Sequence, residues 1–277
     1  MTVQPLDGVR IVTIALNLPG PAAARRLLSL GATITKVEPP NGDPMAAYHP
    51  EWYAALSAGQ AVQRIDLKTD AGRVALDALL QSADLLLTSS RISALRRIGL
   101  DRHSVRGRHP LLSQVAITGY PGEQSDRTGH DLTYIAAAGL VRPPEMPRTL
   151  VADLAGSERA VAAVLAVMLS RERGGGPGYL EVSLAEVAHD LAEPLRVGVT
   201  RPGGLLGGGF PGYALYRASD GWIAVAALEP HFLRALEQEA GRTAEAMAAT
   251  FAQHTMSHWE RRGIDLGIPM VAVRSKE

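Results

Sequence analysis

Short runs of Val, Ile and Leu alternate along the chain with longer stretches in which apolar residues recur every three or four positions. Runs of this length, bounded by Gly, Pro, Asp or Ser, are typical of buried strands, and the longer stretches are typical of helices. Strand and helix alternate regularly, which predicts an α/β fold with a doubly wound, parallel, Rossmann-like sheet. The predicted strands are residues 9–16, 32–38, 61–68, 84–90, 111–120 and 179–184.

Three helices are predicted within this part of the chain. In "PGPAAARRLLSLG", Pro21 suits a first helical turn and Gly31 suits a C-terminal stop. Residues 70–83 begin with an aspartate and have the apolar spacing of a helix. A further helix, from about residue 156 to 173, is apolar nearly all round and is therefore predicted to be buried. Sheets of this class bind their ligands at the carboxyl ends of the strands, so the loops there are the first places to search.

The glycine-rich stretch "RPGGLLGGGFPG" suggests a domain boundary. We predict a large domain over residues 1–200, a linker over residues 201–212 and a small α+β domain over residues 213–277. In the small domain, "YALYRASDGWIAVAAL" predicts two strands joined by a Ser-Asp-Gly turn, with Trp222 in the core. A segment with helical spacing of its apolar residues and a last predicted strand, "PMVAVR", follow.

Composition excludes several classes of function. The 28 basic and 28 acidic residues balance, so neither nucleic acid nor a membrane surface is an expected partner. The absence of cysteine excludes disulfides, zinc–thiolate sites and thiol nucleophiles. No histidine pair has the spacing of a helical zinc site with its glutamate, so no metal is expected. No apolar run spans a bilayer and no signal peptide is visible, so we expect a cytoplasmic protein.

Two glycine-containing segments are possible nucleotide sites on composition alone. The loop "GGGFPG" has no strand–turn–helix context and no following Lys-Ser/Thr, so it is not a phosphate-binding loop. The segment "VRIVTIALNLPGP" lacks the G-x-G-x-x-G pattern, which argues against a dinucleotide. We therefore expect no prosthetic group.

Three residues could carry acid–base chemistry. His130, in "RTGHDLTYIAAAG", stands where a helix begins and could pack, cap or carry a proton, and Asp131 beside it could cap the same helix. Asp153, in "TLVADLAGSERAVAAVLAVML", could be an N-cap, a base or a nucleophile. Glu229, in "AALEPHF", could be a solvated loop carboxylate. Taken singly, each residue leaves these alternatives open.

The order of several segments resembles the family III CoA-transferases and, more narrowly, their relatives the α-methylacyl-CoA racemases. The similar segments are "LDGVRIVTI", "PGPAAARRLLSLGATITKVEPPNGDP", "DLKTDAGR", "ADLLLTSSRISALRRIGLD", "AITGYPGEQSDRTGHDLTY", "VADLAGSERAVAAVLAVMLSRERGGGPGYLEVSL" and "FPGYALYRASDGWIAVAALEPHF". They extend over nearly the whole chain. The resemblance implies the interlocked homodimeric fold of that family and a substrate that is an acyl thioester of coenzyme A.

The resemblance also implies roles for the three residues. The catalytic aspartate of the family falls on Asp153, which in the transferases attacks the thioester and carries the acyl group as a mixed anhydride. The racemase branch has Gly-His-Asp where many transferases have Gly-Tyr-Asp, and this places its catalytic histidine on His130. A glutamate paired with that histidine falls on Glu229. Racemisation at C2 of a 2-methylacyl thioester needs acid–base groups on both faces of an enolate, which His130 and Asp153 would provide.

Coenzyme A contacts are the part in which the chain departs from the family pattern. The resemblance implies contacts at Arg91, Lys68, Leu18 and Pro19. The loop "TSSRIS" keeps only the arginine of the usual Asn-Phe-Arg-Pro-Gly, "SAGQAVQRIDLK" lacks an Asn-Arg-x-Lys run, and Pro39 stands where racemases are often basic. Family members also continue beyond "VRSKE". Three alternatives therefore stay open: a racemase or epimerase, a CoA-transferase that uses Asp153 as nucleophile, and a non-catalytic thioester-binding relative.

Overall fold

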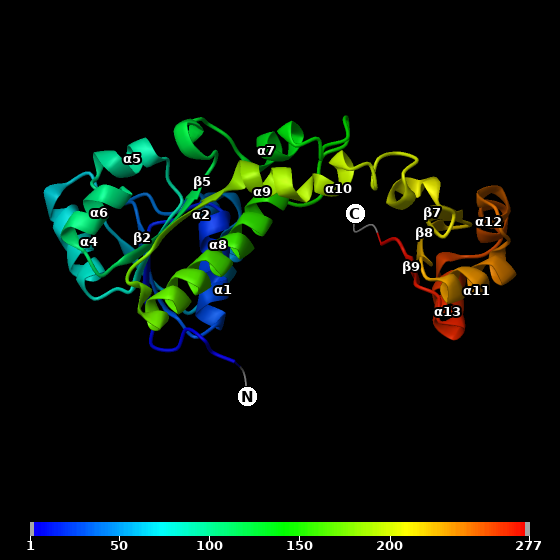
Figure 1. The fold of residues 1–277 in the computed structure, drawn as a ribbon, viewed down its shortest axis with the longest axis horizontal. Helices are drawn as coiled ribbons and strands as arrows, with labels where there is room; N and C mark the ends of the chain where they lie inside the picture. Colours follow the sequence, from blue (N-terminus) through cyan, green and yellow to red (C-terminus); the bar gives the residue numbers. More distant parts are fainter. Residues whose placement is uncertain (1–2, 275–277) are drawn as a thin grey trace. The chain divides into compact units, whose positions relative to one another are not determined.

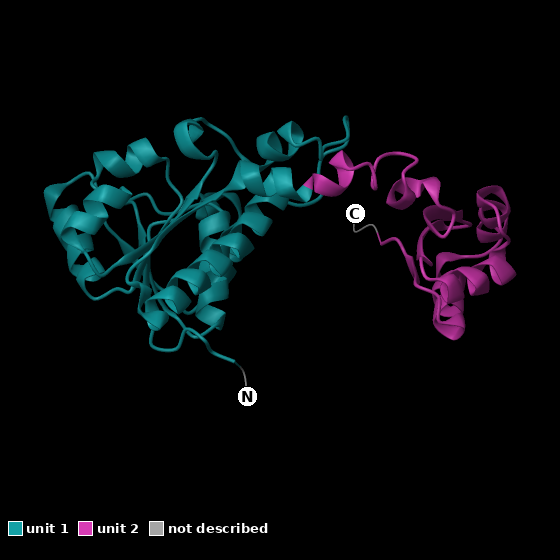
Figure 2. Ribbon diagram, viewed as in Figure 1, with its two compact units in different colours: residues 1–191 teal, residues 192–277 magenta. Residues whose placement is uncertain are grey.

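The computed structural model describes residues 3–274, which divide into two compact units. Unit 1 comprises residues 1–191 and unit 2 comprises residues 192–277 (Figure 2). The glycine-rich residues 201–212 lie within unit 2, where they include the short helix η3 (Leu205–Gly209). The domain limits expected from the sequence stay a prediction, and the two units are described separately below.

Unit 1 is built on a six-stranded sheet in which every neighbouring pair is parallel. The strand order is β3-β2-β1-β4-β5-β6, so the order reverses between β1 and β4. This confirms the predicted doubly wound α/β fold. The strands are β1 (Arg10–Thr13), β2 (Thr33–Glu38), β3 (Ala61–Arg64), β4 (Leu85–Thr88), β5 (Ser113–Thr118) and β6 (Tyr179–Ser183).

Helices cover both faces of this sheet (Figure 1). Successive side chains of a strand point to opposite faces, and in β4 Leu85 and Leu87 join one hydrophobic cluster while Leu86 joins another. The first cluster includes residues of α1 (Pro19–Ser29) and α8 (Val151–Ser170). The second includes residues of α4 (Asp70–Gln81), α5 (Ile92–Arg97) and α6 (Arg102–Arg108). Burial on both faces explains why a central strand such as β4 reads as a continuous apolar run.

The remaining elements of unit 1 lie in the connections. Residues 39–60, between the predicted strands at 32–38 and 61–68, contain α2 (Pro44–Tyr48) and α3 (Pro50–Ser57). The others are η1 (Gly122–Gln124), α7 (Asp131–Ala137), η2 (Arg171–Gly175) and α9 (Leu184–Leu191). Helix α8 begins at Val151, five residues before the predicted start, and this difference bears directly on the site.

Unit 2 contains α10 (Glu193–Arg196), η3 and a three-stranded antiparallel sheet backed by helices. The ring of Phe251 stacks on Tyr216 and packs against Trp259 in its core. Trp222 is 44% exposed, with the Arg217 guanidinium over its ring, so its predicted place in the core is wrong. The elements are β7 (Tyr213–Ala218), β8 (Gly221–Ala226), β9 (Met270–Ala272), α11 (Pro230–Ala240), α12 (Ala244–Phe251) and α13 (Met256–Leu266).

Candidate active site

A cavity of about 580 Å³ opens in unit 1 where β1, β4 and β5 end. We call it the carboxyl-end cavity. Its walls come from the loops that follow β1 and β4, from the end of β5, and from the starts of α7 and α8. It therefore lies where the strand order reverses, which is the usual ligand site of a doubly wound sheet. Four of the predicted site residues line it: His130, Asp153, Arg91 and Pro19.

His130 is the residue immediately before α7, and its side chain is exposed. Its backbone N–H donates to Thr133 Oγ1 at 3.0 Å, and that hydroxyl donates to the His130 carbonyl at 2.8 Å. A Cβ at Gly129 would collide with the ring of Tyr134, so only glycine lets the backbone pass there. The backbone of His130 is thus held at the helix start beside the cavity.

Asp153 is the third residue of α8 and is half-buried. Burial, with a smaller contribution from the negative charge of Asp131, raises the pKa of Asp153 from 3.8 to about 7. A carboxyl group with such a pKa is present in both protonation states near neutral pH. It can therefore accept a proton in one direction of a reaction and donate it in the other.

The sequence suggested that Asp131 could cap its own helix, α7, but in the structure it does not. It is the first residue of α7, it is only 4% exposed, and its Oδ1 accepts the backbone N–H of Asp153 at 2.9 Å. The carboxylate therefore caps α8, satisfying one of the free N–H groups of its first turn. This bond ties together the starts of α7 and α8, which present His130 and Asp153.

The side chain of Tyr134 packs between these helix starts and the end of β5. It is buried, and its ring lies so close to Gly119 and Gly129 that a Cβ at either position would collide with it. It also packs edge-on against Tyr120, with 5.3 Å between the ring centroids. Burial raises the pKa of Tyr134 to about 12, so this hydroxyl stays neutral at physiological pH.

Three guanidinium groups line the carboxyl-end cavity: those of Arg91, Arg97 and Arg127. Arg91 directly precedes α5, and the Arg127 guanidinium lies 4.5 Å from the centroid of the Tyr120 ring. Of these three arginines, only Arg91 was predicted from the sequence. Arg127 stands three residues before His130 and Arg97 is at the end of α5, so their positions in the chain offered a signal that was missed.

Two predicted site residues of unit 1 do not line this cavity, and a third belongs to unit 2. Leu18 is buried in a small cluster with Met45 and Leu56. Lys68 is exposed in the loop after β3, and its N–H donates to an aspartate of the same loop. Glu229 directly precedes α11 in unit 2 and is exposed. The roles of these residues, including the pairing of Glu229 with His130, stay predictions.

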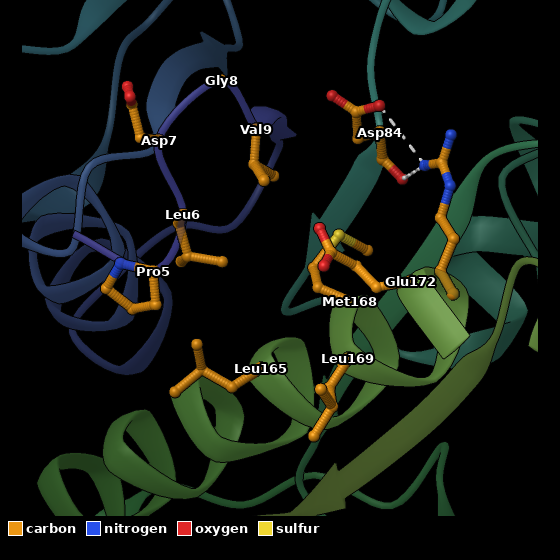
Figure 3. A pocket seen from close by; sticks show the side chains of 11 residues that line it. Pro5, Leu6, Asp7, Gly8, Val9, Asp84, Leu165, Met168, Leu169 and Glu172 are labelled. Atoms are coloured by element: carbon orange, nitrogen blue, oxygen red, sulfur yellow. Dashed lines mark hydrogen bonds and ion pairs between the residues drawn. The ribbon is translucent and has the colours of Figure 1, made fainter. Parts of the chain in front are cut away.

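A second cavity, of about 780 Å³, lies at the other end of the sheet, where β1 and β4 begin (Figure 3). We call it the amino-end cavity. Leu165, Met168 and Leu169 of α8 face the segment that leads into β1. Asp84 and Arg171, which also line it, form an ion pair at 3.3 Å. None of the predicted site residues lines this cavity, although it is the larger of the two.

Residues 3–274 hold no group of three or more His, Cys, Asp or Glu side chains arranged to bind a metal ion. None of the helices in the described part of the chain is long and apolar enough to cross a membrane.

One cavity of this doubly wound α/β unit holds a histidine and a carboxyl group with a pKa of about 7. Such an arrangement is suited to the transfer of protons or acyl groups. The chain matches the CoA-transferase family III over residues 6–277, and it belongs to that family. This confirms the assignment made from the sequence motifs.

Individual relatives include both activities of interest. A probable fatty acyl-CoA transferase of Mycobacterium tuberculosis, Rv3272, is 31% identical over 68% of this chain and 52% of its own length. The human α-methylacyl-CoA racemase is 26% identical over 92% of this chain and 69% of its own. A crystal structure of Rv3272 superposes with a TM-score of 0.87 at 25% identity, covering 99% of this chain and 84% of that one. The sequence match thus spans about half the length of the mycobacterial relative.

Proposed function

We propose that this protein racemises or epimerises C2 of a 2-methylacyl-CoA thioester. In this proposal His130 removes the C2 proton from one face and Asp153 returns a proton to the other, with the roles exchanged in the reverse direction. The observation that carries the proposal is the presence of both side chains in one cavity, with the pKa of Asp153 raised to about 7. Each acid–base group could contribute about 10²–10⁴-fold to the rate.

The surroundings of Asp153 support an enolate intermediate. The first turn of α8 has backbone N–H groups that no carbonyl within the helix can satisfy, and Asp131 accepts only that of Asp153. The partial positive charge of a helix N-terminus stabilises an oxyanion nearby. A thioester oxygen placed at this helix start would therefore become easier to charge, and the C2 proton would become easier to remove.

The cations of the cavity support a polyanionic ligand. Arg91, Arg97 and Arg127 give the cavity three positive charges, and guanidinium groups suit phosphate oxygens because they donate hydrogen bonds as a planar fork. The diphosphate and 3′-phosphate of coenzyme A have the matching charge. Coenzyme A would thus be bound as part of the substrate. Glu229 keeps the role that the resemblance assigns, the orientation of His130.

A CoA-transferase is the second candidate, because a relative that is 31% identical is named as a probable transferase. In that reaction the ionised Asp153 carboxylate would attack the thioester carbonyl. The bond from carbon to sulfur would break, coenzyme A would leave as thiolate, and the acyl group would remain on Asp153 as a mixed anhydride. This chemistry uses Asp153 but does not need an imidazole at His130.

One incubation separates the two candidates. A single epimer of 2-methylacyl-CoA is kept in D₂O with the protein, with and without an added free carboxylic acid. Racemisation predicts one deuterium at C2 and the loss of optical purity, whether or not the acid is present. Transfer of coenzyme A to the acid, with no deuterium at C2, would refute the racemase proposal and favour the transferase. If neither reaction occurs, a non-catalytic thioester-binding protein is the remaining candidate.

A further inference from the structure

Asn17 has an unusual backbone conformation in the wall of the carboxyl-end cavity. Its φ of +64° is the one positive value among the non-glycine residues of the described chain. Left-handed backbone is unfavourable for residues with a side chain, although asparagine tolerates it better than most. Interactions from outside the loop between β1 and α1 must therefore help to hold it.

Two side chains hold this loop. Asp43 Oδ1 accepts the N–H of Asn17 at 3.1 Å, and Ser89 Oγ accepts the N–H of Leu16 at 2.9 Å. Ser89 lines the cavity, whereas Asp43 is not among the residues that line it and is only 2% exposed. The same Oδ1 atom also accepts the N–H of Met45, the second residue of α2, and so caps that helix.

A buried lysine supports Asp43. Lys36 is fully buried on β2, and its Nζ lies 2.7 Å from Asp43 Oδ2 and 2.8 Å from Glu38 Oε1. The hydroxyl of Tyr53 donates to Glu38 Oε1 at 2.7 Å, and the Lys36 ammonium lies 4.8 Å from the centroid of the Tyr53 ring. Every charge in this network has a partner of opposite charge, which a buried charge requires.

A network of buried charges is weak evidence for stability, because apolar side chains of the same volume often stabilise a protein equally well. The distinguishing property of this network is that its last member, Asp43, accepts a hydrogen bond from the backbone of Asn17, a residue of the cavity wall. We infer that Lys36 and Asp43 are positioning residues that hold the Asn17 backbone in its left-handed conformation, and that this conformation shapes the cavity for the thioester of coenzyme A. The part that concerns the ligand rests on the proposed function.

The test compares Asp43→Ala with a matched control, Asp101→Ala. Asp101 caps α6 by accepting the N–H groups of His103 and Ser104, so its loss also removes a helix cap, but it does not line the carboxyl-end cavity. The first readout is hydrogen exchange of the Asn17 amide in the protein without ligand. The second is the dissociation constant of coenzyme A, measured by calorimetry.

Asp43→Ala should accelerate exchange of the Asn17 amide at least ~10-fold, because the amide loses its acceptor. It should weaken coenzyme A binding about 10-fold, and if turnover is measured it should raise KM more than it lowers kcat. Asp101→Ala should lower the melting temperature without either change. Equal effects of the two variants on Asn17 exchange, or on coenzyme A binding, would overturn the inference.

A second variant covers the case in which Asp43→Ala does not fold. Asn17→Val leaves the buried network intact but puts a β-branched residue where φ is positive, so it should also weaken coenzyme A binding. If both variants fold, their effects on binding should be far from additive in the double variant, because they act on the same backbone segment. Full additivity, or unchanged binding by Asn17→Val, would contradict the inference. If the wild type binds no coenzyme A, the proposed function fails, and the exchange of Asn17 still decides whether Asp43 holds the loop.

Discussion

The two ends of the unit 1 sheet carry cavities of comparable size and different chemistry. At the carboxyl end, His130, Asp153 and three arginines surround about 580 Å³. At the amino end, a cavity of about 780 Å³ is lined by apolar side chains of α8 and by three carboxylates, and the arginine there is paired with Asp84. Volume therefore does not identify the site. The predicted proton-handling residues and three arginines lie where the strands end, as the geometry of parallel sheets favours.

The largest expected effect comes from removing the proton-handling side chains. His130→Ala and Asp153→Asn should each lower racemisation at least ~10²-fold, and up to ~10⁴-fold, because each removes one acid–base group. His130 is exposed, and no ion pair within residues 3–274 holds the half-buried Asp153, so the fold should tolerate both changes. Optical purity of the thioester over time measures the loss. Full activity of either variant would show that the residue has only a structural role.

The arginines should affect binding more than chemistry. Arg91→Met and Arg97→Met should each raise KM roughly 10–100-fold, the range expected when a hydrogen bond between charged groups is lost, with kcat changed little. Arg171→Met, at the amino-end cavity, is the matched control and should leave KM unchanged. Steady-state kinetics make the comparison. Equal effects of all three variants would mean that the carboxyl-end cavity has no special affinity for the anionic ligand.

Asp131 should tune the pH dependence of the reaction. Its charge is the second cause of the raised pKa of Asp153, after burial, so Asp131→Asn should lower that pKa. The limb of the kcat/KM profile that belongs to Asp153 should then move to lower pH by less than about one unit, since burial remains. The asparagine oxygen can still accept the N–H of Asp153, so helix α8 should stay capped. An unmoved limb would assign it to another group.

Stability should depend on pH through Asp153 in a definite direction. The folded pKa of about 7 exceeds the ordinary value of 3.8, so the folded state binds the extra proton between these two pH values. The stabilisation is complete below pH 4 and is lost as pH rises through 7. Asp153→Asn should therefore raise the melting temperature at pH 8 by a few degrees, about 2–4 °C for each kcal/mol, and give no gain at pH 4. A gain of equal size at both pH values would contradict the raised pKa.

The smallest effects are expected at the amino-end cavity. Leu169 is 50% exposed there, so Leu169→Gln should change the melting temperature by no more than a degree or two, as is usual for a surface substitution. Racemisation should be unchanged, because no residue of this cavity reaches the carboxyl ends of the strands. A loss of activity without unfolding would show that the two ends of the sheet are coupled.

The sequence predicted the fold because unit 1 follows local rules closely. Apolar runs such as that of β4 are buried on both faces, and the start of α1 carries its prolines where a helix accepts them. The start of α8 could not be predicted in the same way. Its first turn is capped by Asp131, which lies 22 positions from Asp153 in the sequence. A pattern of neighbouring residues therefore could not reveal this cap.

The candidate site likewise contains residues that local motifs predict and residues that they do not. His130 and Asp153 were found from motifs, and the fold brings both to one cavity. Asn17 and Asp43 were not found, because a positive φ and a buried ion pair depend on contacts between segments far apart in the chain. The burial that raises the pKa of Asp153 is also a property of the fold, and the sequence alone could suggest it only through the helix start.

The central claim is that His130 and Asp153 act on opposite faces of one carbon. The most direct measurement is deuterium incorporation at C2 from D₂O, made separately on the (R) and (S) thioesters with His130→Ala and with Asp153→Asn. Each variant retains one base, so we expect each to exchange a single epimer without racemising it, and the two variants to exchange opposite epimers. Exchange of the same epimer by both variants, or racemisation by either one at the wild-type rate, would contradict the two-base account.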